Sequence, residues 1–194
     1  MSLPTIVLAA GASTRLGQPK QLVFVDGEML LERAMRMARE AGTNPILVVL
    51  GAHFAPICAR IDFQDAIPVL NEEWQHGIST SIHSGLRELD VRAPDSKCAL
   101  LMTCDQPRLT AAHLRALIAA FQAQSASSIA ASSYAGALGT PAIFPRSLFP
   151  QLLALRDDKG ARALIAAASL KVVTVPFAGG ETDIDEPADL DQLR

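Results

Sequence analysis

The 194-residue sequence has few cysteines, no excess of positive charge and no long apolar run. Cys58, Cys98 and Cys104 are odd in number and lack C-x-x-C spacing, which argues against a disulfide framework or a cysteine zinc site. The formal net charge of -3 argues against a general nucleic-acid binder, which normally presents a basic face. Apolar runs such as "CALLM" at 98–102 are far shorter than the roughly 20 residues that span a bilayer.

The start of the chain also lacks a recognisable targeting signal. "MSLP" has neither the basic nor the apolar region of a secretory signal. Together with the few cysteines, this predicts a soluble protein of the reducing cytoplasm. Apolar residues make up 49% of the chain and charged residues 19%, which predicts a folded protein rather than a disordered one. The length fits a single domain over residues 1–194.

Segments typical of strands alternate with segments typical of helices. Strands are predicted at 5–9, 45–50, 67–71, 98–105 and 171–175, and helices at 28–41, 54–61, 79–89, 110–124, 161–168 and after Pro187. The Ala/Ser/Gly-rich segment 125–140 is predicted to hold one strand, at 128–132, and a mobile loop. This alternation predicts an α/β fold: one Rossmann-like, doubly wound and mostly parallel sheet covered on both faces. Ligands of such sheets bind beyond the carboxyl ends of the strands, which directs the search to the loops after Ala9, Asn71, Asp105 and Val175.

The first of these loops combines turn residues with fixed positive charge. It lies in "VLAAGASTRLGQPKQL" at 7–22, where glycines allow tight turns and close approach of the backbone to an anion. Arg15 and Lys20 add charge, so the loop is predicted to bind phosphate. The alternative is an ordinary turn whose two basic side chains are solvated. The spacing fits neither G-x-x-x-x-G-K-[ST] nor G-x-G-x-x-G.

Acidic residues occur at two further places. Asp105 follows the predicted strand 98–105, and "TDIDEP" at 182–187 places Asp183 and Asp185 on the same side of an extended segment. Mg²⁺ prefers carboxylate oxygens and often uses one or two of them together with substrate phosphates. The alternatives are a loop cap at Asp105 and ordinary helix capping before Pro187.

The segment "NEEWQHGISTSIHSGL" at 71–86 carries small and hydroxyl residues ahead of a predicted helix. From the residues alone, Gly77, Ser79 and Ser81 are interpreted as a helix entry with Ser79 as the N-cap. Trp74 is interpreted as a packing residue. The four histidines are scattered without an H-x-x-x-H pair, which favours surface or core positions over metal ligation.

The first loop resembles L-A-x-G-x-S-x-R-x-G-x-x-K-x-L, the opening motif of the MobA/MocA-like molybdenum cofactor nucleotidyltransferases and their sugar-nucleotide relatives. The resemblance implies that the loop wraps a nucleotide triphosphate, whose charge Arg15 and Lys20 neutralise. Ala10 favours the molybdopterin cytidylyltransferase branch, because guanylyl relatives more often carry glycine there. The segment 71–86 resembles the same branch and implies that its glycine and serines lie near the base. The implied nucleotide-binding residues are Leu8, Ala9, Ala10, Gly11, Ser13, Arg15, Lys20, Gly77, Ser79 and Ser81.

"CDQP" at 104–107 and "DIDEPADL" at 183–190 resemble the metal-binding elements of the same family. The resemblance implies that Asp105 and Asp185 hold Mg²⁺, and that Arg15, Lys20 and Asp105 are the catalytic residues. "GTPAIF" at 139–144 and "DDKGARALI" at 157–165 also resemble the cytidylyl branch. Thr140 and Asp157 depart from its usual pattern and leave the acceptor open.

The hypothesis from the sequence is therefore Mg²⁺-dependent transfer of CMP from CTP to the phosphate of molybdopterin or the molybdenum cofactor, with a molybdoenzyme as a further partner. In-line transfer at phosphorus needs positioning and charge stabilisation more than a protein nucleophile. This agrees with the lack of a Ser-His-Asp or Cys-His constellation. The alternatives are guanylyl transfer, a sugar or polyol phosphate acceptor, a non-catalytic carrier of pterin or nucleotide, and a relative recruited to redox chemistry.

Overall fold

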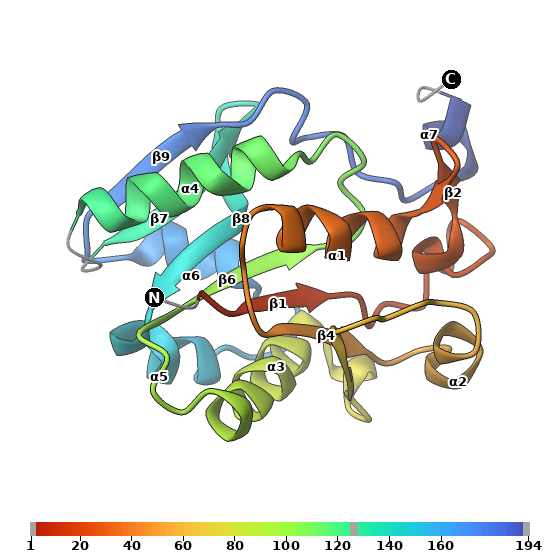
Figure 1. The fold of residues 1–194 in the computed structure, drawn as a ribbon, viewed down its shortest axis with the longest axis horizontal. Helices are drawn as coiled ribbons and strands as arrows, with labels where there is room; N and C mark the ends of the chain where they lie inside the picture. The colour runs from red at the N-terminus through yellow and green to blue at the C-terminus, as the bar shows by residue number, and fades with distance from the viewer. Residues whose placement is uncertain (1–2, 125–127, 192–194) are drawn as a thin grey trace.

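Seven strands form one sheet at the centre of the computed structural model, which describes residues 3–124 and 128–191 (Figure 1). Their spatial order is β5-β4-β1-β6-β8-β7-β9. All neighbours pair in parallel except at β8, which is antiparallel to both β6 and β7. The predicted mostly parallel α/β fold is confirmed. The strands are β1 Thr5–Leu8, β4 Ile46–Leu50, β5 Ile67–Leu70, β6 Cys98–Thr103, β7 Ile129–Tyr134, β8 Ala137–Pro145 and β9 Val172–Pro176.

Helices cover both faces of the sheet (Figure 1). They are α1 Leu30–Glu40, α2 Phe54–Cys58, α3 Ile78–Arg92, α4 Ala111–Ala123, α5 Phe149–Leu153, α6 Ala161–Ala167 and α7 Pro187–Asp191, with short 3₁₀ segments η1 Lys20–Leu22, η2 Trp74–His76 and η3 Arg146–Leu148. A two-stranded hairpin, β2 Phe24–Val25 and β3 Glu28–Met29, precedes α1. No helix within the described residues is long and apolar enough to cross a membrane.

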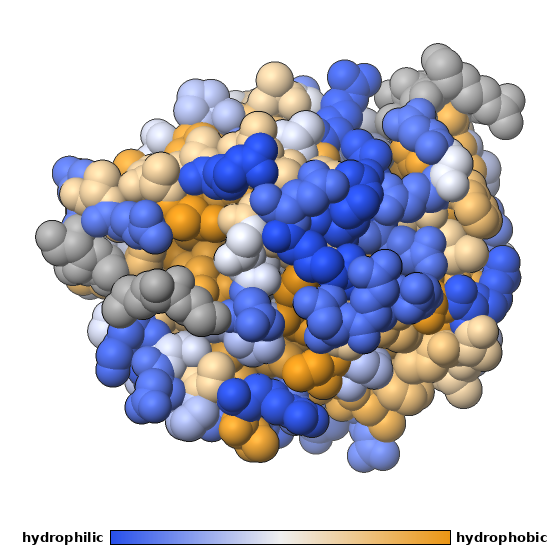
Figure 2. Space-filling view, viewed as in Figure 1, coloured by the Kyte–Doolittle hydropathy of each residue, from blue (hydrophilic) through white to orange (hydrophobic). Residues whose placement is uncertain are grey.

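Alternation along the central strands divides the core into two layers. Val7 of β1 packs with α1 and α4, whereas Ile6 and Leu8 pack with α3, α5 and α6. The strands β1 and β4 are buried throughout, which explains their continuous apolar sequence. Hydrophilic side chains gather over the outer surface of α1, as its amphipathic pattern predicts (Figure 2).

The strand predicted at 128–132 is observed as β7, but the mobile loop predicted in the rest of 125–140 is wrong for residues 133–140. Residues 133–140 complete β7, form a tight turn at Ala135 and Gly136, and begin β8. Both turn residues have positive φ, which allows the sharp reversal. The small residues here lie in the interior of a sheet, where Ala130 and Ala131 are fully buried. Residues 125–127 lie outside the described part of the chain.

The site lies where the chain returns to the carboxyl ends of β1 and β6. The backbone N–H of Ile184 donates to the carbonyl oxygen of Asp105, 3.0 Å away, which joins the segment 181–186 to the end of β6. Ile184 is fully buried in a small cluster with Leu16, Val23, Val25 and Leu30. This cluster brings the two predicted acidic segments and the loop after β1 to one edge of the sheet.

Candidate active site

The loop between β1 and η1, residues 9–19, is tied to its own exit and is called the signature loop below. The buried Gln21 amide nitrogen donates to the carbonyl oxygens of Ala9 at 2.6 Å and Gly11 at 3.3 Å. The hydroxyl oxygen of Ser13 accepts a hydrogen bond from the Lys20 backbone N–H at 3.1 Å. These contacts set the shape of the loop without any ligand.

The signature loop presents a row of free backbone donors. From Ala10 to Arg15, no backbone N–H donates to a carbonyl oxygen among the residues that the structure describes. Within this row, Ser13 adopts a left-handed conformation with φ of 54°. Consecutive unpaired amides in such a turn form a concave anion-binding surface.

A cavity of about 350 Å³ opens between this loop and the N-terminus of α3. Its walls come from four places in the sequence: the end of β1 with the signature loop, the segment around η2, the end of β6, and the loop before α6. The lining residues are Leu8, Ala9, Ala10, Gly11, Ala12, Lys20, Gln21, Trp74, Gln75, Gly77, Ile78, Ser81, Thr103, Cys104, Asp105 and Asp158. A lysine and signature-loop residues with free amides, together with apolar wall residues, suit a phosphorylated ligand that carries a flat, weakly polar group.

Lys20 joins the two acidic segments. Its ammonium nitrogen lies 3.0 Å from Oδ2 of Asp105 and 2.5 Å from Oδ1 of Asp185. The lysine side chain is only 14% exposed. Burial alone would lower the pKa of Lys20, but the charges and hydrogen bonds of Asp105 and Asp185 together raise it above its ordinary value. Lys20 therefore stays protonated at neutral pH.

Arg15 reaches the same acidic segment from the solvent side. Its Nη2 lies 2.9 Å from Oδ2 of Asp185, and the side chain is 65% exposed. The hydrogen bond from Lys20 and the two basic charges lower the pKa of Asp185. Asp189 of α7 accepts the backbone N–H groups of Asp185 and Glu186 at 2.9 and 2.7 Å, which holds this turn in place.

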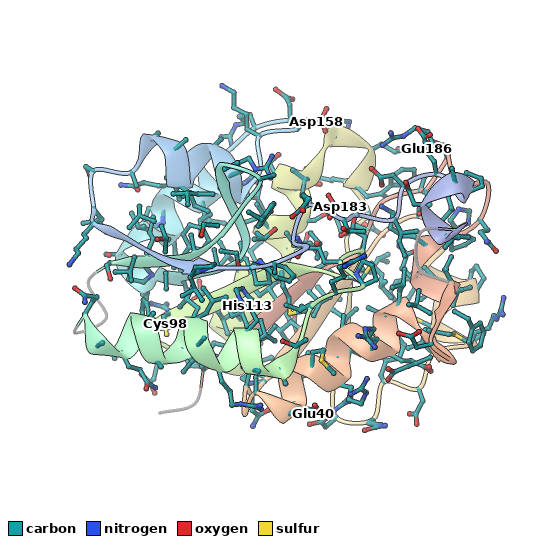
Figure 3. All side chains as sticks on the ribbon, turned by 90° about the horizontal axis from the view of Figure 1, so that it is seen from above. Glu40, Cys98, His113, Asp158, Asp183 and Glu186 are labelled. Atoms are coloured by element: carbon teal, nitrogen blue, oxygen red, sulfur yellow. The ribbon has the colours of Figure 1, made fainter. Side chains whose placement is uncertain are left out.

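Asp183 faces a second cavity, of about 230 Å³, which also contains Asp105 in its wall. Desolvation of the carboxylate, followed by the charges of Asp105 and Asp185, raises the pKa of Asp183 to about 7. Figure 3 shows Asp183 and Asp158 on the same side of the molecule, although they come from segments 25 residues apart. His113 of α4 lies on the other side in that view, stacked on Phe177 with ring centroids 4.5 Å apart.

The N-terminus of α3 does not match the interpretation of Ser79 as its N-cap. The helix begins at Ile78 with Gly77 as its N-cap, so Ser79 is not the cap. Ser79 is buried, and its backbone N–H donates to the carbonyl oxygen of Asp157 at 3.2 Å. Gly77 has a φ of 95°, and an added Cβ would lie 2.3 Å from the backbone of Asp157. The glycine is therefore required by the close approach of the loop before α6.

The structure brings most of the predicted nucleotide-binding residues to one cavity. Leu8, Ala9, Ala10, Gly11, Lys20, Gly77 and Ser81 line it, and so does Asp105, which was predicted as a metal ligand. Ser13 instead lines an adjoining cavity of about 610 Å³ on the outer side of the loop. Arg15, Ser79 and Asp185 lie near the main cavity without lining it.

Sequence reasoning missed three features of the site. Gln21 holds the signature loop from inside, but the sequence shows it only as a polar residue between Lys20 and Leu22. Trp74 does pack, as expected, yet it also lines both the main and the adjoining cavity. It sits against Gly51, where an added Cβ would approach the Trp74 Cβ to 2.4 Å. The second cavity around Asp183 could not be found from spacing, because residues from six separate segments form it.

The carboxylates suit a divalent cation only in part. Within residues 3–124 and 128–191, no three His, Cys, Asp or Glu side chains converge as a metal-binding group. Asp105 and Asp185 do converge, because both reach the single ammonium of Lys20, a cation already held between them. Mg²⁺ commonly takes one or two carboxylates and completes its shell with water and substrate phosphate. The pair thus fits a metal that arrives with a phosphorylated substrate.

The sheet order, the loop after β1 and the paired acidic segments define an α/β nucleotidyltransferase fold. The family model of the MobA-like NTP transferase domain matches residues 5–172. The chain belongs to this family.

Two relatives match most of the chain. The purine catabolism protein PucB of Bacillus subtilis is 30% identical over 200 residues, covering 97% of this chain and 94% of PucB. The nicotine blue oxidoreductase of Paenarthrobacter nicotinovorans is 30% identical over 166 residues, covering 82% and 79% of the two chains. A probable molybdenum cofactor guanylyltransferase of Opitutus terrae is 28% identical over 111 residues, 57% of this chain and 52% of that protein.

Among solved structures, Rv0371c of Mycobacterium tuberculosis has a TM-score of 0.83 and 29% sequence identity. The match covers 100% of this chain and 98% of the other. A structure of Rv0371c in complex with manganese matches with a TM-score of 0.82 and 27% identity. A divalent metal therefore occurs in a protein of the same fold and of similar sequence.

Proposed function

We propose that this protein transfers CMP from CTP to the phosphate of molybdopterin or the molybdenum cofactor and releases pyrophosphate. The observation that carries the proposal is the convergence of Lys20, Asp105 and Asp185 beside a cavity walled by free signature-loop amides. This arrangement supports binding of a triphosphate at the carboxyl edge of the sheet, where ligands of such folds bind. The relative named as a molybdenum cofactor guanylyltransferase supports the class of acceptor.

In the proposed reaction, an oxygen of the acceptor phosphate attacks the α-phosphorus of the nucleotide. The bond from that phosphorus to the oxygen bridging to the β-phosphate breaks, and pyrophosphate leaves with the electron pair. The N–H groups of 10–15 bind phosphate oxygens, and Lys20 offsets the charge that grows on the leaving group. Arg15 is 65% exposed and paired with Asp185, so it acts from the rim of the site.

Asp105 and Asp185 would hold Mg²⁺ in this proposal, and Asp183 is the next carboxylate along the same segment. A divalent cation supplies Lewis-acid polarisation of the phosphate oxygens when it is bound. The structure of Rv0371c in complex with manganese supports binding of a divalent cation in this proposal. Lys20 must give up at least part of its contact with the two carboxylates for the metal to share them.

The choice of CTP rests on the signature loop. Ala10 is 6% exposed and lines the main cavity, and its carbonyl oxygen accepts the backbone N–H of Ala52 at 3.0 Å. A side chain larger than glycine at this position narrows the cavity, which supports the smaller pyrimidine base. The reaction is proposed for the cytoplasm, which agrees with three free cysteines.

The decisive experiment measures pyrophosphate release from CTP, GTP, ATP and UTP, with molybdopterin or its molybdenum form as acceptor, with and without Mg²⁺. We expect release with CTP and acceptor together, and loss of it with EDTA. The Asp105→Ala protein should be about 10²–10³-fold slower, as for other preorganised electrostatic groups. Preference for GTP would refute the cytidylyl assignment, and near-normal turnover of Asp105→Ala would refute the metal site.

One relative is named as an oxidoreductase, so redox chemistry is tested next if the pyrophosphate assay is negative. If no nucleotide releases pyrophosphate, the protein is assayed for oxidation of NAD(P)H with a dye-like acceptor. A positive result would replace transfer by redox chemistry as the function. Binding of a pterin or nucleotide without either reaction would indicate a carrier.

A further inference from the structure

The proposed metal ligand Asp185 lies on a short segment that is attached to the fold at few points. Its neighbour Ile184 is fully buried in an apolar cluster with Leu16 of the signature loop, and the Ile184 backbone N–H donates to the carbonyl oxygen of Asp105 at 3.0 Å. Side chains alternate along an extended segment, so burial of Ile184 turns Asp185 the other way, toward Lys20. These contacts end at Ile184, and the backbone of Asp185 needs a further attachment.

The helix α7 supplies this attachment through the carboxylate of Asp189. Its Oδ2 accepts the backbone N–H of Asp185 at 2.9 Å and that of Glu186 at 2.7 Å. The backbone N–H of Asp189 donates in turn to the carbonyl oxygen of Glu186 at 3.0 Å, which closes the turn. A carboxylate in the first turn of a helix that reaches back in this way satisfies N–H groups that have no partner within the helix. The bond to Asp185 therefore fixes the backbone of the proposed metal ligand itself.

The next residue, Leu190, attaches α7 to the same apolar cluster. Leu190 packs against the cluster that contains Ile184 and Leu16, and α7 lies beside β2 (Figure 1). An isolated helix of five residues is not stable in water, so the position of α7 depends on these tertiary contacts. The consecutive residues Asp189 and Leu190 thus hold the acidic segment through its backbone and through its buried side chain. Neither of them lines the main, adjoining or second cavity, so neither contacts a ligand there.

We propose that Asp189 is a positioning residue: by holding the backbone of Asp185, it sets where the Asp185 carboxylate meets a divalent cation. The inference rests on the proposed function, which makes Asp185 a metal ligand. The Asp185 side chain is 40% exposed, so packing does not lock it in place. A ligand on a loose turn must be ordered when the cation binds, and this cost lowers the affinity. Groups that orient a metal ligand typically contribute about 10–100-fold to metal affinity.

Binding of Mn²⁺ to the full chain tests the proposal without turnover. Electron paramagnetic resonance measures free Mn²⁺ during a titration, with and without CTP and with no acceptor present. Asp189→Ala should raise the Kd for Mn²⁺ about 10–100-fold. Asp189→Asn should stay within about threefold of wild type, because its amide oxygen still accepts a backbone N–H. Asp62→Ala is the matched control and should not change the Kd: the Asp62 carboxylate also accepts a backbone N–H, that of Gln64 at 3.0 Å, but lines none of the three cavities.

The Ala and Asn variants separate positioning from charge. Both remove the same negative charge near the site, but only Asn keeps a hydrogen-bond acceptor. Equal weakening of Mn²⁺ binding in the two variants would show a long-range charge effect and overturn the positioning role. Leu190→Ala loosens α7 without a change of charge and should also weaken Mn²⁺ binding. Wild-type affinity in both Asp189→Ala and Leu190→Ala would overturn the proposal, and melting temperatures check that each variant is folded.

The metal dependence of turnover separates this inference from the proposed function. In the pyrophosphate assay, Asp189→Ala should raise the Mg²⁺ concentration for half-maximal rate about 10-fold or more and leave kcat at saturating Mg²⁺ within about threefold. A lower kcat at an unchanged Mg²⁺ requirement would refute the positioning role. If the wild-type protein releases no pyrophosphate with any nucleotide, the proposed transfer is refuted, and the Mn²⁺ titrations still decide the role of Asp189. If it binds no Mn²⁺ with or without CTP, the metal site and the positioning role are both refuted.

Discussion

Replacing Lys20 by methionine perturbs the centre of the site. Methionine keeps most of the apolar stem but removes the ammonium that joins Asp105 and Asp185. Lys20 and Asp105 side chains are 14% and 21% exposed, so their ion pair is largely shielded from water. Loss of one partner of a fully buried pair costs about 3–5 kcal/mol. Asp185 is 40% exposed, and solvent screening reduces the cost, so we expect a free energy of unfolding lower by about 1–3 kcal/mol at pH 7.

The drop in the free energy of unfolding caused by Lys20→Met should depend on pH. The folded state raises the pKa of Lys20, so its contribution is fully present below the unfolded value of about 10.4 and disappears only at higher pH. The folded state lowers the pKa of Asp185, so that contribution is present above about pH 3.9 and disappears as pH falls through the folded value. The difference between wild type and Lys20→Met should therefore be largest between about pH 5 and 9 and shrink below about pH 4.

Urea unfolding followed by the fluorescence of Trp74 measures this difference at each pH. Lys97→Met is the matched control, because Lys97 is exposed and forms no salt bridge within the described residues. Equal unfolding midpoints for wild type and Lys20→Met at pH 7 would refute the ion-pair reasoning. Turnover is a separate readout: we expect a loss of about 10²–10³-fold in pyrophosphate release, and near-normal turnover would refute the role of Lys20 in transfer.

Three further changes test other parts of the site. Gly77→Ala should lower the unfolding free energy by about 2 kcal/mol or more, because Gly77 has a positive φ and an added Cβ would collide with Asp157. Gly136→Ala is the control: Gly136 also has a positive φ but faces open space, so this variant should lose less unfolding free energy in the same urea titration. Gln21→Leu should raise the KM for the nucleotide about 10-fold or more with a smaller effect on kcat, since the loop carbonyls lose their donor; an unchanged KM would contradict this. Asp183 has its pKa raised to about 7, so between about pH 4 and 7 the folded state binds the extra proton and wild-type stability falls as pH rises. Asp183→Asn should remove that part of the slope, and parallel stability curves for the two proteins would refute it.

Much of the fold could be predicted because local pattern and tertiary packing agree. The predicted helix at 28–41 is observed as α1, and its apolar stripe is buried under the sheet. Thr110, which precedes α4, has the residue type of an N-cap, and its hydroxyl oxygen accepts the backbone N–H of His113 at 3.2 Å. The strand at β7 was predicted, but the first part of β8 and its pairing with β7 were not, because Ala, Ser and Gly carry weak strand preference. Burial between β6 and β9 decides the conformation of this hairpin.

The residues of the candidate site could largely be predicted from the sequence, but their contacts with one another could be predicted only in part. The signature loop and Asp105 were placed at strand ends from the sequence, and the structure puts them around one cavity. Sequence spacing did not indicate that Lys20 lies between two carboxylates, since Asp105 is 85 residues away and Asp185 is 165 residues away. Nor did it show that Asp183 rather than Asp185 faces the second cavity.

The sequence by itself determined the alternation of strands and helices, the glycine-containing loop with its two basic residues, and the presence of two acidic segments. These are local properties: hydrophobic period, turn residues and the chemistry of single side chains. Only the tertiary structure decided that Arg15 pairs at the rim, that Gln21 holds the loop from inside, and that Arg162 and Gln106 line one cavity. These properties depend on distances between segments that meet only when the sheet brings its strand ends together, and no local pattern records those distances.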